Sequence, residues 1–172
     1  MKTSAKKINS KTSWKEKLEK HKAEGVDIPE VWQNKFGIGK MLIPEGVEVE
    51  KLIKEIPKGK LVTIFELRKK LATDFSIKFE EVKMCCPLVT GIFIRISAEL
   101  GYYEFQNGKN GKKNIIPYWR VVKDDGKLFD KFPCGVKFQF KKLTEEGFEF
   151  EKYKSGKFLK VKNVENHIYQ YT

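Results

Sequence analysis

One short segment, TIFELRKKLA, constrains the fold most because it carries a complete start signal for a helix. Thr63 and Glu66 have the spacing of a capping box, in which each side chain binds a backbone N–H of the first turn. The apolar stripe of this helix is predicted to consist of Phe65, Leu67 and Leu71. The segment therefore predicts a helix with one face on a core, and a loop near residues 73–84 follows it.

A second apolar segment, CCPLVTGIFIRISAEL, comes after this loop. Pro87 suits the first turn of a helix. The apolar residues that follow it are Leu88, Val89, Ile92, Phe93, Ile96 and Leu100. Gly91 and the β-branched residues also allow a buried strand. Two short helices joined in this way are typical of a helix-turn-helix. In such a motif the second helix, here residues 87–100, would enter a groove of DNA.

The rest of the chain predicts two more helices and small hairpins. One helix starts after Pro44 and ends at Pro57-Lys58-Gly59, and another spans 136–146 with Gly147 past its end. A glycine- and asparagine-rich loop covers residues 101–114. Hairpins are predicted at 121–128, around the sequence DDG, and at 148–162, around Ser155-Gly156. The expected fold class is mainly α with small β hairpins.

The N-terminal part of the chain is read as an arm and a connector. Residues 1–12 are polar and rich in lysine, residues 13–24 predict a short surface helix, and the connector to residue 43 shows no long period. We therefore predict three segments. They are a basic arm with its connector at 1–43, a segment of helices and hairpins at 44–150 and a C-terminal hairpin extension at 151–172.

Charge predicts the kind of partner. The chain has 35 Lys and Arg against 23 Asp and Glu, a formal net charge of +12, which favours a polyanion such as nucleic acid or an anionic membrane surface. A lysine-rich composition without a specific partner is the alternative. No run approaches the roughly 18 to 20 apolar residues that span a bilayer, and the first residues lack the apolar region of a signal peptide. We expect a cytoplasmic protein that does not bind membranes.

The cysteines and histidines predict neither a disulfide framework nor a zinc site. Cys85 and Cys86 are adjacent, Cys134 is the third cysteine, and His21 and His167 stand near opposite ends of the chain. We therefore expect no metal and no cofactor.

Three segments together carry a family resemblance: IPKGKLVTIFEL, IIPYWRVVKDDGKL and KLTEEGFEF. In this order and at these separations they resemble the DNA-binding domain of the O6-alkylguanine-DNA alkyltransferases and their alkyltransferase-like relatives. Proline-x-x-Arg-Val-Val followed by aspartate-glycine is the most specific part. The resemblance covers about residues 44–150 and implies a winged-helix architecture.

The resemblance also implies which residues matter. The active family has proline-cysteine-histidine-arginine-valine, where cysteine accepts the alkyl group and a histidine linked to a glutamate helps to form its thiolate. Pro117 and Arg120 match this motif, but Tyr118 stands at the cysteine position and Trp119 at the histidine position. Glu146 matches the relay glutamate and has no histidine to polarise. A phenol is a poor nucleophile at neutral pH and indole is no base, so no alkyl transfer is expected through this motif.

Alkyltransferase-like proteins also lack the cysteine, bind alkylated guanine and flag it for other repair proteins. The resemblance thus implies that Tyr118 could stack on or abut a flipped base, a contact worth ~1–3 kcal/mol. Arg120 would support the loop or a phosphate. Alternatively, Tyr118 and Trp119 fill the former pocket and pack the core.

Other positions depart from the family. The tyrosine that rotates the nucleotide's phosphate falls on Ile64, and the inserted arginine falls near Thr90, with Arg95 as a later substitute. Asn110 has the spacing of the hinge asparagine. These changes suggest DNA binding without deep base extrusion. The expected phosphate contacts come from the arm and from Lys109, Lys112, Lys113 and Lys123. About four to six such contacts give a log–log salt slope of about −4 to −5.

A relocated thiol is a minor alternative. Cys134 falls in the loop that closes the family's alkyl pocket, and Cys85 and Cys86 stand where a helix dipole can lower a thiol pKa. We expect all three to fill space.

The main hypothesis is a non-enzymatic protein that binds double-stranded DNA. Recognition of alkylated DNA and a repair-protein partner are what the resemblance implies. A general winged-helix nucleic-acid binder and a protein-interaction scaffold are the two rivals.

Overall fold

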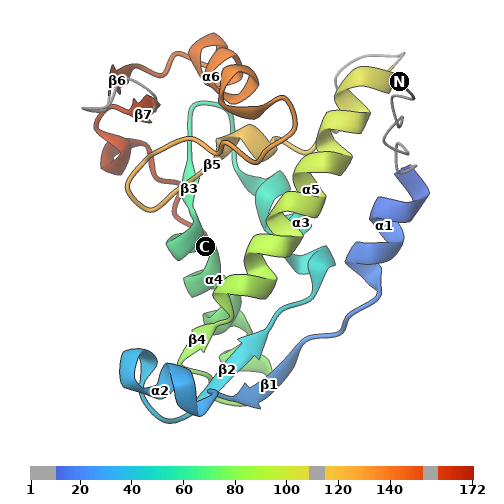
Figure 1. The fold of residues 1–172 in the computed structure, drawn as a ribbon, viewed down its shortest axis with the longest axis vertical. Coiled ribbons are helices and arrows are strands. Elements are labelled where there is room, and N and C mark those ends of the chain that lie inside the picture. The colour runs from blue at the N-terminus through green and yellow to red at the C-terminus, as the bar shows by residue number, and fades with distance from the viewer. Residues whose placement is uncertain (1–10, 109–114, 153–158) are drawn as a thin grey trace, which may run out of the picture.

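The computed structural model of the chain describes residues 11–108, 115–152 and 159–172 (Figure 1). The described residues form six α-helices and several short strands, so the prediction of a mainly α fold with small hairpins is confirmed. The helices are α1 (Lys11–Glu19), α2 (Glu30–Phe36), α3 (Gly46–Glu55), α4 (Ile64–Lys78), α5 (Pro87–Asn107) and α6 (Gly135–Glu145).

Helix α5 runs through the middle of the molecule, and α1 and α3 pack beside it (Figure 1). Leu18 of α1 is fully buried in the same core as Ile53 of α3, Leu67 of α4 and Ile94 of α5. The N-terminal helix therefore adds to the main core. The division of the chain at residues 43 and 150 stays a prediction.

The connector is more regular than its sequence indicates. Strand β1 (Glu24–Asp27) pairs antiparallel with β2 (Lys40–Ile43), and β2 pairs parallel with β4 (Met84–Cys85). The connector, for which the sequence predicts no long period, thus holds two strands and the short helix α2. The helix predicted at 13–24 is present as α1 but ends at Glu19. A second small core of Ile28, Met41 and Cys86 fixes these strands. Such pairing depends on a distant strand, which no local period reveals.

Helices α4 and α5 are longer than predicted. Helix α4 continues to Lys78, and Phe75 in its last turn is buried in the core. The predicted loop, at residues 73–84, therefore began too early in the chain. Helix α5 continues to Asn107 through the residues expected as a loop, and its alternative as a strand was wrong. Tyr102 and Phe105 hold this extension because both rings pack edge-to-face on Phe138 of α6, at 5.4 and 5.3 Å between centroids.

The hairpin predicted at 121–128 has the right turn and the wrong partner. The Lys123 N–H donates to the Lys127 carbonyl at 2.9 Å, which closes the turn. Strand β5 (Val121–Val122) nevertheless pairs parallel with β3 (Val62–Thr63), next to α4. The last hairpin is confirmed by the antiparallel pair β6 (Phe150–Lys152) and β7 (Leu159–Val161). Its turn at Ser155-Gly156 lies outside the described residues.

Candidate functional site

The turn that carries the family-like motif lies between α5 and β5. Residues Tyr118–Arg120 form a single 3-10 turn, called η1, after Pro117. The turn presses against α5 at Gly101, where a Cβ atom would lie 2.7 Å from the Ile116 carbonyl oxygen and 3.0 Å from the Tyr118 ring. Any side chain at residue 101 would therefore push the turn away from the helix.

Tyr118 fills the core. Its side chain is fully buried, and its ring meets Phe132 edge-to-face at 5.4 Å and stacks on Phe138 at 6.2 Å. The phenol pKa is raised above its usual value, first by burial and then by the nearby Cys134 and Tyr102. No described residue forms a hydrogen bond with its hydroxyl. The sequence left two roles open for Tyr118, packing the core or stacking on a flipped base. This geometry matches packing, because the ring would have to leave the core to reach a base.

Helix α6 holds the turn through two polar side chains. Gln139 is fully buried, and its amide donates to the carbonyls of Trp119 at 3.1 Å and Val121 at 2.8 Å. Glu146, just after α6, accepts hydrogen bonds from the Trp119 indole at 2.8 Å and from Arg120 Nε at 3.0 Å. The relay position thus binds an indole and a guanidinium in place of a histidine.

Arg120 ties the turn to the end of α3. Its second terminal nitrogen forms an ion pair with Glu146 at 2.9 Å, and its first donates to the Ile56 carbonyl at 2.6 Å. Glu146 also accepts from the Gly59 N–H at 3.3 Å. Arg120 therefore supports the loop, one of its two predicted roles, whereas its contact with a phosphate stays a prediction.

Thr90 and Arg95 lie in different surroundings on α5. Thr90 is fully buried, and its hydroxyl donates to the Cys86 carbonyl at 2.7 Å. Thr90, predicted near the position of the family's inserted arginine, therefore faces the core. Its contact with DNA stays a prediction, for which the side chain would have to become exposed. Arg95 is exposed on the same helix.

The predicted basic set is only partly visible. Lys109, Asn110, Lys112 and Lys113 lie outside the described residues. Lys123 is half-buried, forms an ion pair with Asp130 at 3.5 Å and lies over the Phe129 ring. Its contact with a phosphate, like that of the unplaced lysines, stays a prediction.

The thiols differ in their surroundings. Burial raises the pKa of the Cys85 thiol to about 11, although the hydrogen bond with Thr90 acts to lower it. The start of α5 therefore does not yield a thiolate at Cys85. Cys86 is also buried. Cys134 is exposed and donates to the Tyr102 hydroxyl at 2.8 Å. The two buried thiols match the expected space-filling role, whereas Cys134 does not.

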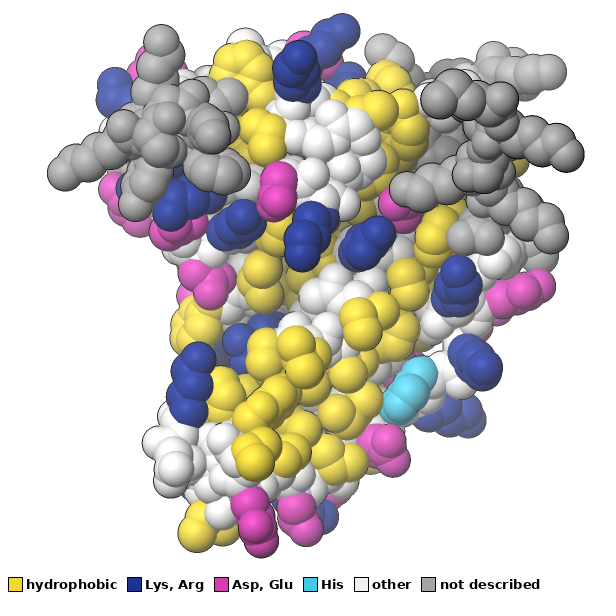
Figure 2. Space-filling view, viewed as in Figure 1, with side chains coloured by type: hydrophobic (Ala, Val, Ile, Leu, Met, Phe, Trp, Pro, Cys, Tyr) yellow, Lys and Arg dark blue, Asp and Glu magenta, His cyan; other side chains and the backbone are white. Residues whose placement is uncertain are grey.

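The exposed face around α4 and α5 is more apolar than the sequence indicated. Phe65 was assigned to the apolar stripe of α4 but is 54% exposed, and Leu88 and Ile92 of α5 are 64% and 56% exposed. Figure 2 shows hydrophobic side chains over the lower half of the view, around the first turns of α5, with Lys and Arg side chains across the middle. The sequence did hold a signal for this exposure. Apolar residues occur on all sides of α5, which is more than a helix packed on a core by one face requires.

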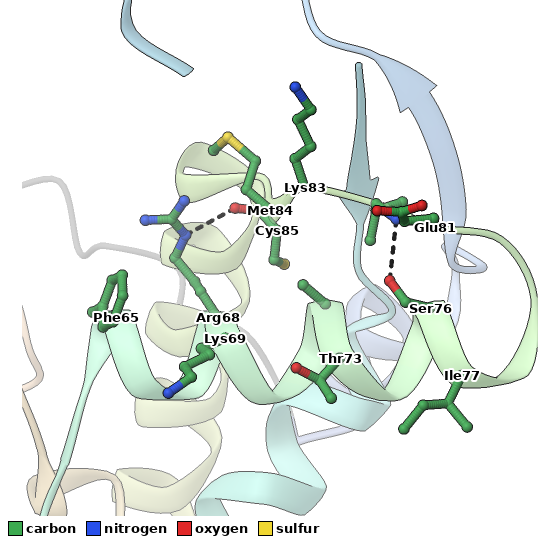
Figure 3. A pocket seen from close by; sticks show the side chains of 12 residues that line it. Phe65, Arg68, Lys69, Thr73, Ser76, Ile77, Glu81, Lys83, Met84 and Cys85 are labelled. Carbon is green, nitrogen blue, oxygen red and sulfur yellow. Dashed lines mark hydrogen bonds between the residues drawn. The ribbon is translucent and has the colours of Figure 1, made fainter. Parts of the chain in front are cut away.

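A groove of about 490 Å³ lies between α4 and β4 on this face (Figure 3). Phe65 stands near one end of α4 and Ile77 near the other. Arg68 reaches from α4 to β4, where its Nε donates to the Cys85 carbonyl at 2.8 Å. Lys69 and Lys83 add two further positive charges to the lining, and Glu81 adds one negative charge.

The described residues include no helix with the length and apolar composition needed to cross a membrane. In the same part of the chain, no group of three or more His, Cys, Asp or Glu residues is placed to hold a metal ion.

The molecule is thus a mainly α protein in which a helix pair leads into a buried, doubly held turn. No protein-family model matches the chain, and no curated protein matches it in sequence. Two similar solved structures are S. pombe Atl1 in complex with damaged DNA containing O6-carboxymethylguanine and S. pombe ATL in complex with DNA. Each is 17% identical over 73% of this chain and 94% of its own, with a TM-score of 0.48. At this identity and TM-score the two structures do not establish a function for this chain, so its function has to be argued from its own residues.

Proposed function

We propose that the protein binds double-stranded DNA through the first half of α5 and transfers no alkyl group. The observation that carries this proposal is an exposed stripe on α5, made of Leu88, Gly91, Ile92 and Arg95. Residues three and four apart share one face of a helix, so these four form a continuous surface. We call it the α5 stripe.

The composition of the α5 stripe suits a groove of DNA. Proteins that bind the minor groove frequently insert Leu, Ile or Phe between base steps and flank them with arginine or lysine. Here Leu88 and Ile92 provide apolar side chains, and Arg95 follows one turn after Ile92. The net charge of +12 adds attraction to the phosphates. The helix-turn-helix reading of α4 and α5 and the winged-helix architecture belong to this proposal.

The proposed function includes no enzymatic activity. Position 118 holds a buried phenol whose pKa is raised, and the only N–H of the Trp119 indole donates to Glu146. Neither group supplies a thiolate or takes a proton at neutral pH. Because the Tyr118 ring is packed, we propose binding without deep base extrusion. Preference for alkylated guanine and delivery to a repair protein, both implied by the resemblance, are the finer form of this proposal.

The test is fluorescence anisotropy with matched duplexes that carry guanine or O6-methylguanine and have 5′-hydroxyl ends, across a salt series. Arg95→Gln and Ile92→Ser should weaken binding about tenfold, because they remove the charge and the apolar wedge of the α5 stripe. Lys141→Gln on α6 and Ile77→Ser on α4 serve as matched controls with less than about a twofold change. Unchanged affinity in both stripe variants contradicts the proposal. Equal affinity for the two duplexes selects a general DNA binder.

A protein-interaction scaffold is the second candidate. It is favoured by Phe65 and Ile77, which line the groove and are 54% and 78% exposed. Exposed apolar side chains gathered around a groove are typical of a protein-interaction site. Failure to retain either duplex at low salt would select this candidate.

A further inference from the structure

We infer that a second cavity, next to η1, binds a phosphate monoester, either a free mononucleotide or the phosphate at the end of a nucleic-acid strand. The cavity has a volume of about 620 Å³. Among the described residues that line it are three cations, Lys54, Arg120 and Lys142, two aromatic rings, Phe105 and Trp119, and no acid. We call it the η1 cavity.

Four separate elements converge on the η1 cavity. Lys54 comes from the last turn of α3, Phe105 from the end of α5, Trp119 and Arg120 from η1, and Lys142 from α6. The fold therefore gathers positive charge from segments that are far apart in the sequence. A charged surface on a single helix would not make such a concave site.

Lys142 is held largely out of water. Its side chain is 12% exposed, and its ammonium lies 4.7 Å from the centroid of the Phe105 ring and 5.7 Å from that of Trp119. Its acidic partner, Glu145 at 2.7 Å, is about half exposed and does not line the cavity. Ion pairs with exposed groups are weak, so a doubly charged ligand in the cavity can compete for this ammonium.

Arg120 and Lys54 supply the other two charges. The contacts of Arg120 with Glu146 and the Ile56 carbonyl use Nε and one N–H of each terminal nitrogen. A guanidinium has five N–H groups, so one further N–H on each terminal nitrogen can serve a ligand. Lys54 is about half exposed and pairs with Glu50 on its own helix, outside the lining.

This chemistry selects the phosphate monoester as ligand. Such a group carries about −1.5 to −2 charges at neutral pH and three strong acceptor oxygens, which matches three convergent cations. A phosphate inside a nucleic-acid strand carries a single charge and is hindered on both sides. The partly exposed ring of Phe105 lines the same cavity, so a base attached to the phosphate can contact it. The volume lies within the roughly 300–1,000 Å³ typical of small-molecule sites.

The test is isothermal titration calorimetry of the full chain with dGMP, with inorganic phosphate, and with a short single strand that has either a 5′-phosphate or a 5′-hydroxyl. Lys142→Met and Lys54→Met keep an apolar stem and remove one charge. Each should weaken dGMP binding at least tenfold. Lys141→Met and Lys51→Met, on the same two helices but outside the lining, are the controls and should change it less than twofold.

The possible outcomes separate the sources of the phosphate. Preference for dGMP over both strands identifies a free mononucleotide, and preference for the 5′-phosphate strand over the 5′-hydroxyl strand identifies a strand end. Absence of dGMP and 5′-phosphate binding, or equal binding by the parent and both variants, overturns the inference. Because Lys54 is half exposed, Lys54→Met decides the question even if Lys142→Met fails to fold. The inference is independent of the proposed DNA interface, since duplexes with 5′-hydroxyl ends and Arg95→Gln test that interface.

Discussion

The η1 turn and the first half of α5 use their large side chains in opposite ways. In the turn, Tyr118 and Trp119 are buried, and Arg120 is held by Glu146 and by a backbone carbonyl. On α5, Leu88 and Ile92 are more exposed than buried. The turn carries the motif by which the chain resembles a family with a reactive cysteine, yet its residues are engaged in packing.

The difference teaches that the large side chains of a recognisable motif can serve packing, while large side chains elsewhere stay exposed and available for contacts. Glu146 and Arg120 connect η1 with the chain after α3, through the Gly59 N–H and the Ile56 carbonyl. Changes in the turn should therefore lower stability, whereas changes in the α5 stripe should lower binding and leave stability nearly intact.

The largest effect is expected at Tyr118. Tyr118→Ala should lower the free energy of unfolding by about 3–5 kcal/mol, because it removes a buried aromatic ring from a packed cluster. Tyr118→Phe should cost nothing and could add about 1 kcal/mol, since no described residue pairs with the buried hydroxyl. Urea denaturation of the three proteins measures both. A clear loss in Tyr118→Phe would show that the hydroxyl has an essential partner.

The second effect is expected at Glu146. Glu146→Ala should lower the free energy of unfolding by about 3 kcal/mol, because it leaves the Arg120 guanidinium and the Trp119 N–H without their acceptor. Glu146→Gln should cost less, since the amide keeps one acceptor oxygen for these donors. Glu149→Ala, an exposed glutamate paired with Lys162, is the matched control and should cost less than about 1 kcal/mol. Equal losses at residues 146 and 149 would reduce the turn contacts to a surface effect.

The buried thiol predicts a loss of stability in alkali. Burial raises the pKa of the Cys85 thiol from its ordinary value of 9.0 to about 11 in the folded protein. Between these values the unfolded chain releases a proton that the folded chain keeps, so the free energy of unfolding falls as pH rises from about 9 to 11, by on the order of 2 kcal/mol. Below pH 9 this contribution is fully present.

Denaturation curves of the parent and Cys85→Ala across this range measure the effect. The variant should show a constant packing loss at all pH values and a shallower fall above pH 9. Parallel curves would contradict a raised pKa at Cys85. In the same protein, a thiol reagent at pH 8 should modify exposed Cys134 much faster than buried Cys85 and Cys86.

Local signals predicted the parts of the fold that depend on local physics. The Thr63 hydroxyl accepts from the Glu66 N–H at 3.2 Å, which is the N-cap half of the predicted capping box. Pro87 opens α5, and Gly147 follows α6 with φ of +95°, a conformation that glycine adopts readily. Each of these signals lies within a few residues of the structure that it forms.

The missed parts depend on distant partners. Strand β5 takes β3 as its neighbour instead of the segment after its own turn, and β1 with β2 needs β4 to complete a sheet. The candidate site shows the same limit. Glu146 and Trp119 were recognised at matching positions, but their hydrogen bond, the buried Gln139 and the η1 cavity arise only when α6 meets the turn.

The smallest effects on stability are expected in the α5 stripe, and they separate its two kinds of residue. Leu88→Ser, Ile92→Ser and Arg95→Gln should each change the free energy of unfolding by less than about 0.5 kcal/mol, because these side chains are mostly in water.

If Arg95 contacts a phosphate, Arg95→Gln should make the log–log salt slope of DNA binding shallower by about 0.9. Leu88→Ser and Ile92→Ser should weaken binding by a constant factor at every salt concentration, because an apolar contact releases no counterion. Anisotropy titrations of the same duplex measure all three slopes. A salt slope that changes equally in the three variants would show that the stripe acts only by positioning other residues, and a large loss of stability in any of them would end the separation between the turn and the stripe.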